Sequence, residues 1–130
     1  MSDGGSKRAI ATDGAPRAIG PYSQAVAAGG MLFLSGQIAL DPATGTLIEG
    51  SVADETRRVL ANLRAVLAAA GLGMDAVVRT TVYLTSLGDF PIVNQTYEEF
   101  FTAPYPARAT VQVAALPRNA RVEIDAIAIA

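Results

Sequence analysis

The chain of 130 residues contains no cysteine and no histidine. The absence of cysteine excludes disulfide bonds, thiolate catalysis and cysteine-ligated metal centres, because each of these requires a thiol. The absence of histidine excludes the serine–histidine and cysteine–histidine nucleophile systems and most zinc sites. Any chemistry must therefore come from carboxylates, arginine, hydroxyl groups, backbone groups and water.

Charged residues are also scarce. They make up 17% of the chain against 51% hydrophobic residues, whereas roughly 25% charged residues is usual in soluble domains. This imbalance predicts that a second apolar face is buried against other copies of the chain, as in a homo-oligomer. The net charge of −2 argues against a binder of duplex nucleic acid, which needs a basic stripe to contact phosphates.

No apolar run approaches the ~20 residues that a membrane-spanning helix requires. The length is that of one domain, which we place at residues 1–130. Residues 1–8 contain no apolar segment of the kind found in secretory signals, so we expect them to form a short mobile tail of a cytoplasmic protein.

Gly29 and Gly30 separate two short apolar runs, at residues 25–28 and 31–35, a pattern that predicts a β-hairpin. A first short strand is expected at residues 9–12. The segment 37–50 is rich in turn-forming residues and is expected to be a loop.

Two helices are indicated after this loop. Ser51 and Asp54 have the spacing of a capping box, and Gly71 is placed to end the first helix. Its apolar residues recur at helical period; they are Val52, Val59, Leu60, Leu63, Val66, Leu67 and Ala70. Asp89 is a candidate N-cap for the second helix, with Pro91 in the first turn.

Residues 77–84 are rich in β-branched side chains and predict a strand. Two more strands are expected at 108–114 and 121–129, joined by a turn around residues 117–119. The element order β-β-β-α-β-α-β-β predicts an α+β domain in which both helices cover one face of a mixed sheet. The other face is then expected to meet a partner subunit.

Polar side chains interrupt the last two strands. Arg108, Thr110 and Gln112 share one strand face, and Glu123 and Asp125 share a face of the next strand. A guanidinium or carboxylate in an apolar strand is costly unless it is paired. Arg108 could be paired with a small anionic ligand or with a carboxylate of another subunit in a salt bridge. Within the chain, Arg121 or Arg79 could pair with Glu123.

Four motifs in the same order and spacing resemble the RidA/YjgF family of enamine/imine deaminases. They are Gly20–Ala25, Phe33–Ile38, Val93–Tyr97, and Pro106–Arg108 with Val122–Ile124. The resemblance extends from about Ile10 to Ala130. It implies a chorismate-mutase-like fold assembled as a homotrimer, with ligand sites between subunits. It also implies hydrolysis of 2-enamine and 2-imino acids (2-aminoacrylate, 2-iminopropionate, 2-iminobutyrate) to 2-oxo acids and ammonia, without a metal or organic cofactor.

By the same resemblance, Arg108 matches the family's carboxylate-binding arginine, and Glu123 matches the carboxylate that acts on water and the imine nitrogen. The remaining substrate contacts fall on Tyr22, Ser35, Gly36, Asn94 and Thr110. Thr110 stands where the archetypal member has a cysteine. Because the family's contact there runs largely through backbone, we expect the activity to survive this difference.

The positions of Arg108 and Glu123 along the last two strands predict a site shared between two chains. If strand 121–129 returned beside strand 108–114 as an antiparallel neighbour, Arg108 and Glu123 would lie about five or six positions apart, roughly 15–20 Å along the strands. That distance is too long for one small substrate. We therefore predict a site built from Arg108 of one chain and Glu123 of its neighbour.

Two functions of other classes remain open from the sequence. A non-catalytic sensor of small carboxylates could use the same cleft and Arg108. An endoribonuclease would need basic and stacking residues for RNA, which only Arg79, Arg118 and Arg121 could supply as a patch. The acidic balance and the absence of histidine weigh against this second alternative.

Overall fold

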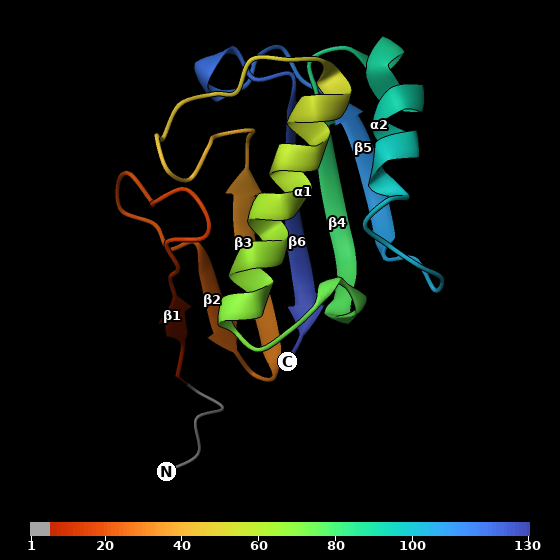
Figure 1. Ribbon diagram of the computed structural model, residues 1–130. Helices are drawn as coiled ribbons and strands as arrows, with labels where there is room; N and C mark the ends of the chain where they lie inside the picture. The colour runs from red at the N-terminus through yellow and green to blue at the C-terminus, as the bar shows by residue number, and fades with distance from the viewer. Residues whose placement is uncertain (1–5) are drawn as a thin grey trace.

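In the part of the chain that the structure describes, six strands form one mixed sheet, and two α-helices pack against a single face of it (Figure 1). The computed structural model describes residues 6–130. The helices are α1 (Val52–Ala69) and α2 (Phe90–Tyr97). The strands are β1 (Arg8–Ile10), β2 (Ala25–Ala28), β3 (Met31–Gln37), β4 (Val77–Leu84), β5 (Ala107–Gln112) and β6 (Val122–Ile129). This order confirms the predicted β-β-β-α-β-α-β-β arrangement and the α+β class.

The differences from the predicted bounds are small. β1 begins at Arg8 and ends at Ile10. Arg8, which was placed in the predicted tail, therefore belongs to a strand, and the strand predicted at residues 9–12 begins one residue and ends two residues earlier than expected. Residues 1–5 of that tail lie outside the described part of the structure. β5 ends at Gln112 rather than at residue 114, because the backbone leaves the sheet there for a short 3-10 turn at Pro117–Asn119.

The strand order is β1-β2-β3-β6-β4-β5, and among these described strands only the pair β4 and β5 runs parallel. Helix α2 lies between these two strands in the chain, and it supplies the crossover that a parallel pair needs. One expectation is therefore wrong: β5 and β6 are consecutive in the chain but are not neighbours in the sheet. Strand β4 separates them and pairs with both.

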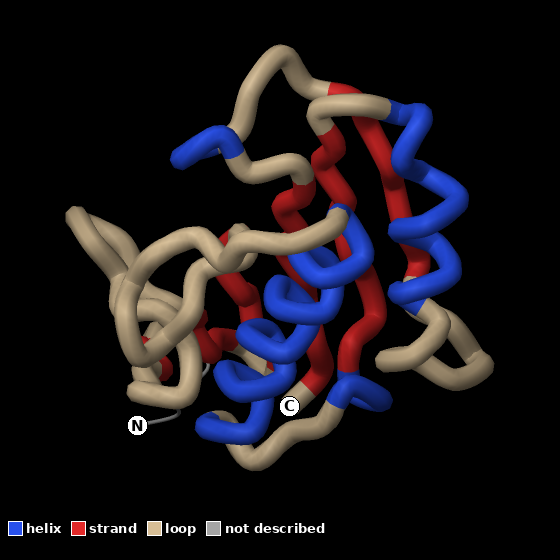
Figure 2. The backbone as a smooth tube through the Cα atoms, turned by 45° about the horizontal axis from the view of Figure 1, so that its top comes forward, coloured by secondary structure: helices blue, strands red, loops and turns tan. Residues whose placement is uncertain are grey.

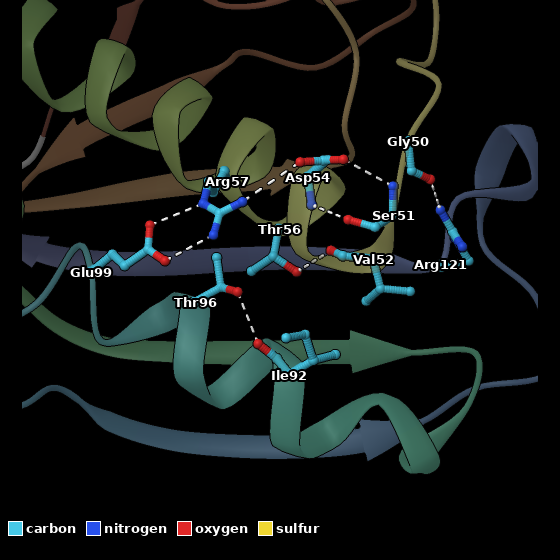
Figure 3. Close-up of polar contacts among 10 residues, drawn as sticks. All are labelled: Gly50, Ser51, Val52, Asp54, Thr56, Arg57, Ile92, Thr96, Glu99 and Arg121. Carbon is cyan, nitrogen blue, oxygen red and sulfur yellow. Dashed lines mark hydrogen bonds and ion pairs between the residues drawn. The ribbon is translucent and has the colours of Figure 1, made fainter.

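Helix α1 starts and stops as its sequence predicts. Ser51 accepts a hydrogen bond from the Asp54 amide at 3.1 Å, and Asp54 accepts one from the Ser51 amide at 3.0 Å (Figure 3). At the other end Gly71 has φ +77°, and the amide of Leu72 donates to the Leu67 carbonyl in a Schellman arrangement. The predicted apolar stripe packs on the sheet; its buried members are Val59, Leu60, Leu63, Val66 and Leu67.

An exposed ion pair links α1 to the segment that directly follows α2. Arg57 of α1 forms two hydrogen bonds with Glu99, at 2.9 and 3.0 Å (Figure 3). Asp89 precedes α2 as predicted, but its side chain makes no capping hydrogen bond, because Asp89 already has helical φ and ψ at the end of a 3-10 turn. Pro91 lies in the first turn of α2, as expected.

Both helices lie on the same side of the sheet (Figure 2), and no helix or strand within residues 6–130 covers the opposite face, which we call the uncovered face. Alternate residues of the strands point toward it, among them Phe33, Val111 and Ile129, which are 44%, 40% and 54% exposed. Such a row of large apolar side chains is typical of a surface that meets another protein chain. Within residues 6–130, neither helix is long and apolar enough to cross a membrane.

Candidate functional site

Two of the residues expected at the site, Arg108 and Asn94, lie together in one pocket. This Arg108 pocket has a volume of about 380 Å³ and lies between α2 and the start of β5. Its lining consists of Asn94, Tyr97, Glu98, Tyr105, Pro106 and Arg108. Thr110 is two residues further along β5 on the same strand face, and is not part of the lining.

Aromatic rings hold the Arg108 guanidinium in place. It lies 4.8 Å from the ring centre of Tyr97 and 5.5 Å from that of Phe90, both on α2. The Tyr97 hydroxyl is itself 2.8 Å from the hydroxyl of buried Thr80 on β4. Within the described residues Arg108 forms no ion pair. The result is an oriented cation without a protein counter-ion, which suits binding of a planar carboxylate.

Tyr22, Gly36 and Glu123 meet in a second hollow, of about 320 Å³, which we call the Glu123 cleft. The register between β3 and β6 shifts between Leu34 and Gln37, which marks a β-bulge at Ser35 and Gly36. The Glu123 carboxylate lies over this bulge. A Cβ atom at position 36 would be 3.0 Å from Glu123 Cδ and closer still to Oε2, so a larger residue there would displace the carboxylate from this position.

The environment of Glu123 raises its pKa above the ordinary value for a glutamate. Burial of the half-buried carboxyl is the larger cause, and the negative charge of Asp125 on the same strand face is the smaller one. The candidate partner Arg121 does not relieve this effect. Its side chain instead contacts the buried carboxylate of Glu55. It also donates to the Gly50 carbonyl (Figure 3). A carboxyl group with a raised pKa can both accept and return a proton near neutral pH.

Arg108 and Glu123 point to opposite faces of the sheet. Arg108 pairs with Thr80 of β4, whose hydroxyl contacts α2, so Arg108 is on the helix-covered face. Glu123 pairs with Tyr83, three positions further along β4 and on the uncovered face. The predicted offset of five or six positions along the strands is therefore wrong, because the register gives three positions, or about 10 Å. In the perpendicular direction β5 and β6 are two strand spacings apart, which adds about 10 Å.

Tyr22 and Ser35 have different surroundings. The Tyr22 side chain is 54% exposed, and its hydroxyl accepts a 3.4 Å hydrogen bond from the Ile19 amide at the rim of the Glu123 cleft. The Ser35 hydroxyl donates to the Ser23 carbonyl at 2.6 Å and does not line the cleft. In this single chain Ser35 therefore stabilises the loop that carries Tyr22. Asp125 accepts a hydrogen bond from Tyr83 at 3.0 Å, in keeping with a structural role.

Sequence reasoning missed two features of these hollows. Tyr97 was not among the expected site residues, yet the Arg108 guanidinium lies 4.8 Å from the centre of its ring. Buried Gln24 anchors one wall of the cleft, since its amide nitrogen donates to the carbonyls of Thr12, Ala15 and Pro16. A buried glutamine directly before a strand could have been suspected from the sequence, but its partners could not.

Known proteins resemble this chain over nearly its whole length. The family model described as endoribonuclease L-PSP matches residues 12–130. Protein DfrA of Myxococcus xanthus is 60% identical over 126 residues, covering 95% of this chain and 96% of that protein. The human 2-iminobutanoate/2-iminopropanoate deaminase is 49% identical over 123 residues, covering 95% and 90%. The crystal structure of the YjgF gene product from E. coli superposes with a TM-score of 0.89 at 48% identity, covering 94% and 98%. The chain therefore belongs to the RidA/YjgF family.

Proposed function

We propose that this protein is a hydrolytic deaminase of 2-imino acids and their enamine tautomers, releasing a 2-oxo acid and ammonia. The observation that carries the proposal is the pair of complementary hollows. One presents an oriented guanidinium that forms no ion pair within residues 6–130, and the other presents a half-buried carboxyl group with a raised pKa. Relatives about 49% identical that are named 2-iminobutanoate/2-iminopropanoate deaminase support the same reaction class.

In the proposed mechanism Arg108 binds the substrate carboxylate and so orients the adjacent imine carbon. The ionised Glu123 carboxylate accepts a proton from a water molecule as the water oxygen attacks that carbon. Glu123 returns this proton to the nitrogen, which gives a carbinolamine. Glu123 then moves the proton of the new hydroxyl group to the amino group, so that the C–N bond breaks and ammonia leaves as the carbonyl forms. Backbone groups at Gly36 and Thr110 are assigned to positioning the water.

The two hollows must come from different copies of the chain for this mechanism to operate. Arg108 and Glu123 lie on opposite faces of one sheet, so a single small substrate cannot contact both within one chain. The uncovered apolar face, with Phe33 and Val111 exposed, provides a surface through which copies can associate. We assign the assembly as a homotrimer with three intersubunit sites, as the family resemblance implies.

The activity is tested by generating 2-iminopropionate in situ with an amino-acid oxidase and trapping the imine that remains with semicarbazide. Wild-type protein is expected to lower the trapped fraction and to release ammonia at the same rate, whereas heat-denatured protein is expected to do neither. Binding of a 2-oxo acid without any acceleration would instead support the carboxylate-sensor alternative. Cleavage of RNA that persists in the Arg108→Ala variant would support the ribonuclease alternative.

Mixing two inactive variants tests the shared site. Chains with Arg108→Ala and chains with Glu123→Ala are unfolded together, refolded together and assayed on 2-iminopropionate. Random mixing in trimers leaves one intact site in each mixed trimer, so roughly a quarter of wild-type activity is expected to return. Each variant refolded alone serves as the control. No recovery in verified mixed trimers would place both residues in one chain and overturn the intersubunit site.

A further inference from the structure

Two arginines in the lining of the Glu123 cleft have no role in the reaction proposed above. Arg17 comes from the loop between β1 and β2, and Arg118 comes from the turn that leads into β6. Within residues 6–130 the ion pairs are formed by Arg57 and Arg121, not by these two. The cleft therefore holds, beside the proposed proton-transfer group, two cations that have no carboxylate partner in the described part of the chain.

The backbone keeps Arg118 at this position. Arg118 and Asn119 both have φ of +59°, in the left-handed region that long side chains seldom adopt. The Arg118 Nη1 atom donates to the Gly45 carbonyl at 2.9 Å, which ties the side chain to the loop before α1. Unusual backbone conformations of this kind persist where surrounding contacts enforce them, and they are concentrated at functional sites.

The proposed reaction already assigns the α-carboxylate of the substrate to Arg108, in a different pocket and on the other face of the sheet. The positive charge in the Glu123 cleft is therefore available for a second anionic group on the same substrate. Guanidinium groups recognise carboxylates through paired, directional hydrogen bonds. Because the cleft belongs to a single chain, this second contact does not depend on the neighbouring subunit.

We propose that Arg17 and Arg118 form a subsite for a side-chain carboxylate, so that the protein favours 2-imino dicarboxylic acids over 2-imino acids with short apolar side chains. This inference rests on the proposed deaminase function and specifies its substrate class. Arg17 and Arg118 are specificity-determining residues in this scheme. The reacting carbon remains with Glu123, and the α-carboxylate remains with Arg108.

The test compares two imines made in situ, 2-iminopropionate from alanine and 2-iminosuccinate from aspartate, with the residual imine trapped by semicarbazide. The measured quantity is the ratio of kcat/KM for 2-iminosuccinate to kcat/KM for 2-iminopropionate. The double variant Arg17→Ala, Arg118→Asn removes both guanidinium groups, and asparagine is chosen because it tolerates the left-handed backbone. Arg64→Ala is the matched control, since Arg64 is an exposed arginine on α1 that lines neither hollow.

Wild-type protein is expected to give a ratio of one or more, and the double variant a ratio at least about tenfold lower. Arg64→Ala is expected to keep the wild-type ratio. A double lysine variant retains the charge without the guanidinium geometry and is expected to be intermediate. Added salt should lower the wild-type ratio, because the cleft is open to solvent and its charges are screened.

An unchanged ratio in the double variant would overturn the subsite, as would an equal loss of both activities or a loss of assembly on size-exclusion chromatography. Wild-type activity on 2-iminopropionate but not on 2-iminosuccinate would overturn the subsite while leaving the deaminase function in place. Wild-type activity on neither imine would remove the proposed function itself. The failure of the inference and the failure of the function are thus separate outcomes.

Discussion

Replacing Arg108 by alanine is expected to lower kcat/KM for 2-iminopropionate by at least about 100-fold, or ~2.7 kcal/mol of transition-state stabilisation. The guanidinium is held on the rings of Tyr97 and Phe90 and has no protein counter-ion among the described residues. Its removal therefore takes away the contact assigned to the substrate carboxylate while leaving no buried charge unpaired. The measurement is the rate of imine loss, with circular dichroism to verify the fold.

The chain offers a matched control for the loss of the aromatic contact. Arg64 lies 5.0 Å from the ring centre of Phe100, so Arg64→Ala removes the same kind of cation–π interaction outside the pocket. Both variants are expected to lose about 0.5–1 kcal/mol of stability, but only Arg108→Ala should lose activity. Arg108→Lys keeps the charge without the paired hydrogen bonds and should recover a small part of the rate. Wild-type turnover by Arg108→Ala would exclude this residue from substrate binding.

Replacing Glu123 by glutamine is expected to lower kcat by about 10²–10⁴-fold, because an amide of the same shape cannot accept and return a proton. In the wild-type protein the raised pKa of Glu123 should appear as an acid limb in the pH profile of kcat/KM. Activity should fall as the pH decreases through a value above the ordinary pKa of a glutamate, since protonation removes the base. That limb should be missing from the residual activity of Glu123→Gln.

Asp125→Asn is the control for this prediction. It removes the second cause of the raised pKa of Glu123 while its side-chain oxygen still accepts from the Tyr83 hydroxyl. The variant should stay active, with its acid limb moved to lower pH. An unchanged pH profile in Glu123→Gln would show that another group carries the proton.

The Glu123→Gln substitution should also change the stability of the folded protein in a pH-dependent way. A carboxyl whose pKa is raised in the folded state favours folding fully only below its ordinary pKa, and this contribution is lost as the pH rises through the raised value. The ionised Glu123 therefore destabilises the folded protein at pH 7, and Glu123→Gln should have the higher Tm there. The difference should disappear below about pH 4. A lower Tm for Glu123→Gln at pH 7 would contradict this electrostatic account.

The elements of the fold could be predicted because their determinants are local. The capping box of Ser51 and Asp54, the Gly71 terminus and the Gly29–Gly30 hairpin each involve residues close in sequence. The alternation that puts Glu123 and Asp125 on the face opposite buried Val122 and Ile124 follows directly from the strand period. The expected substrate contacts around Arg108 and Glu123 came from motifs whose order along the chain was itself informative.

The partners of these residues could not be predicted in the same way. Strands joined by a short turn commonly pair, and that expectation placed β6 beside β5, whereas the structure inserts β4 between them. Arg121 was a candidate partner for Glu123 two residues away, yet it is held by Glu55, which is distant in sequence and buried on α1. The contact between the Tyr97 ring and the Arg108 guanidinium likewise depends on how α2 crosses from β4 to β5.

The sequence by itself determined which residues form strands and helices, which face each side chain takes within its strand, and which family motifs are present. Only the tertiary structure decided that Arg108 and Glu123 lie on opposite faces of one sheet, and that Gly36 lies under the Glu123 carboxylate. The physical reason is the range of the interactions. Periodicity and capping are set by neighbours along the chain, whereas strand order and register are set by pairing between segments far apart in sequence.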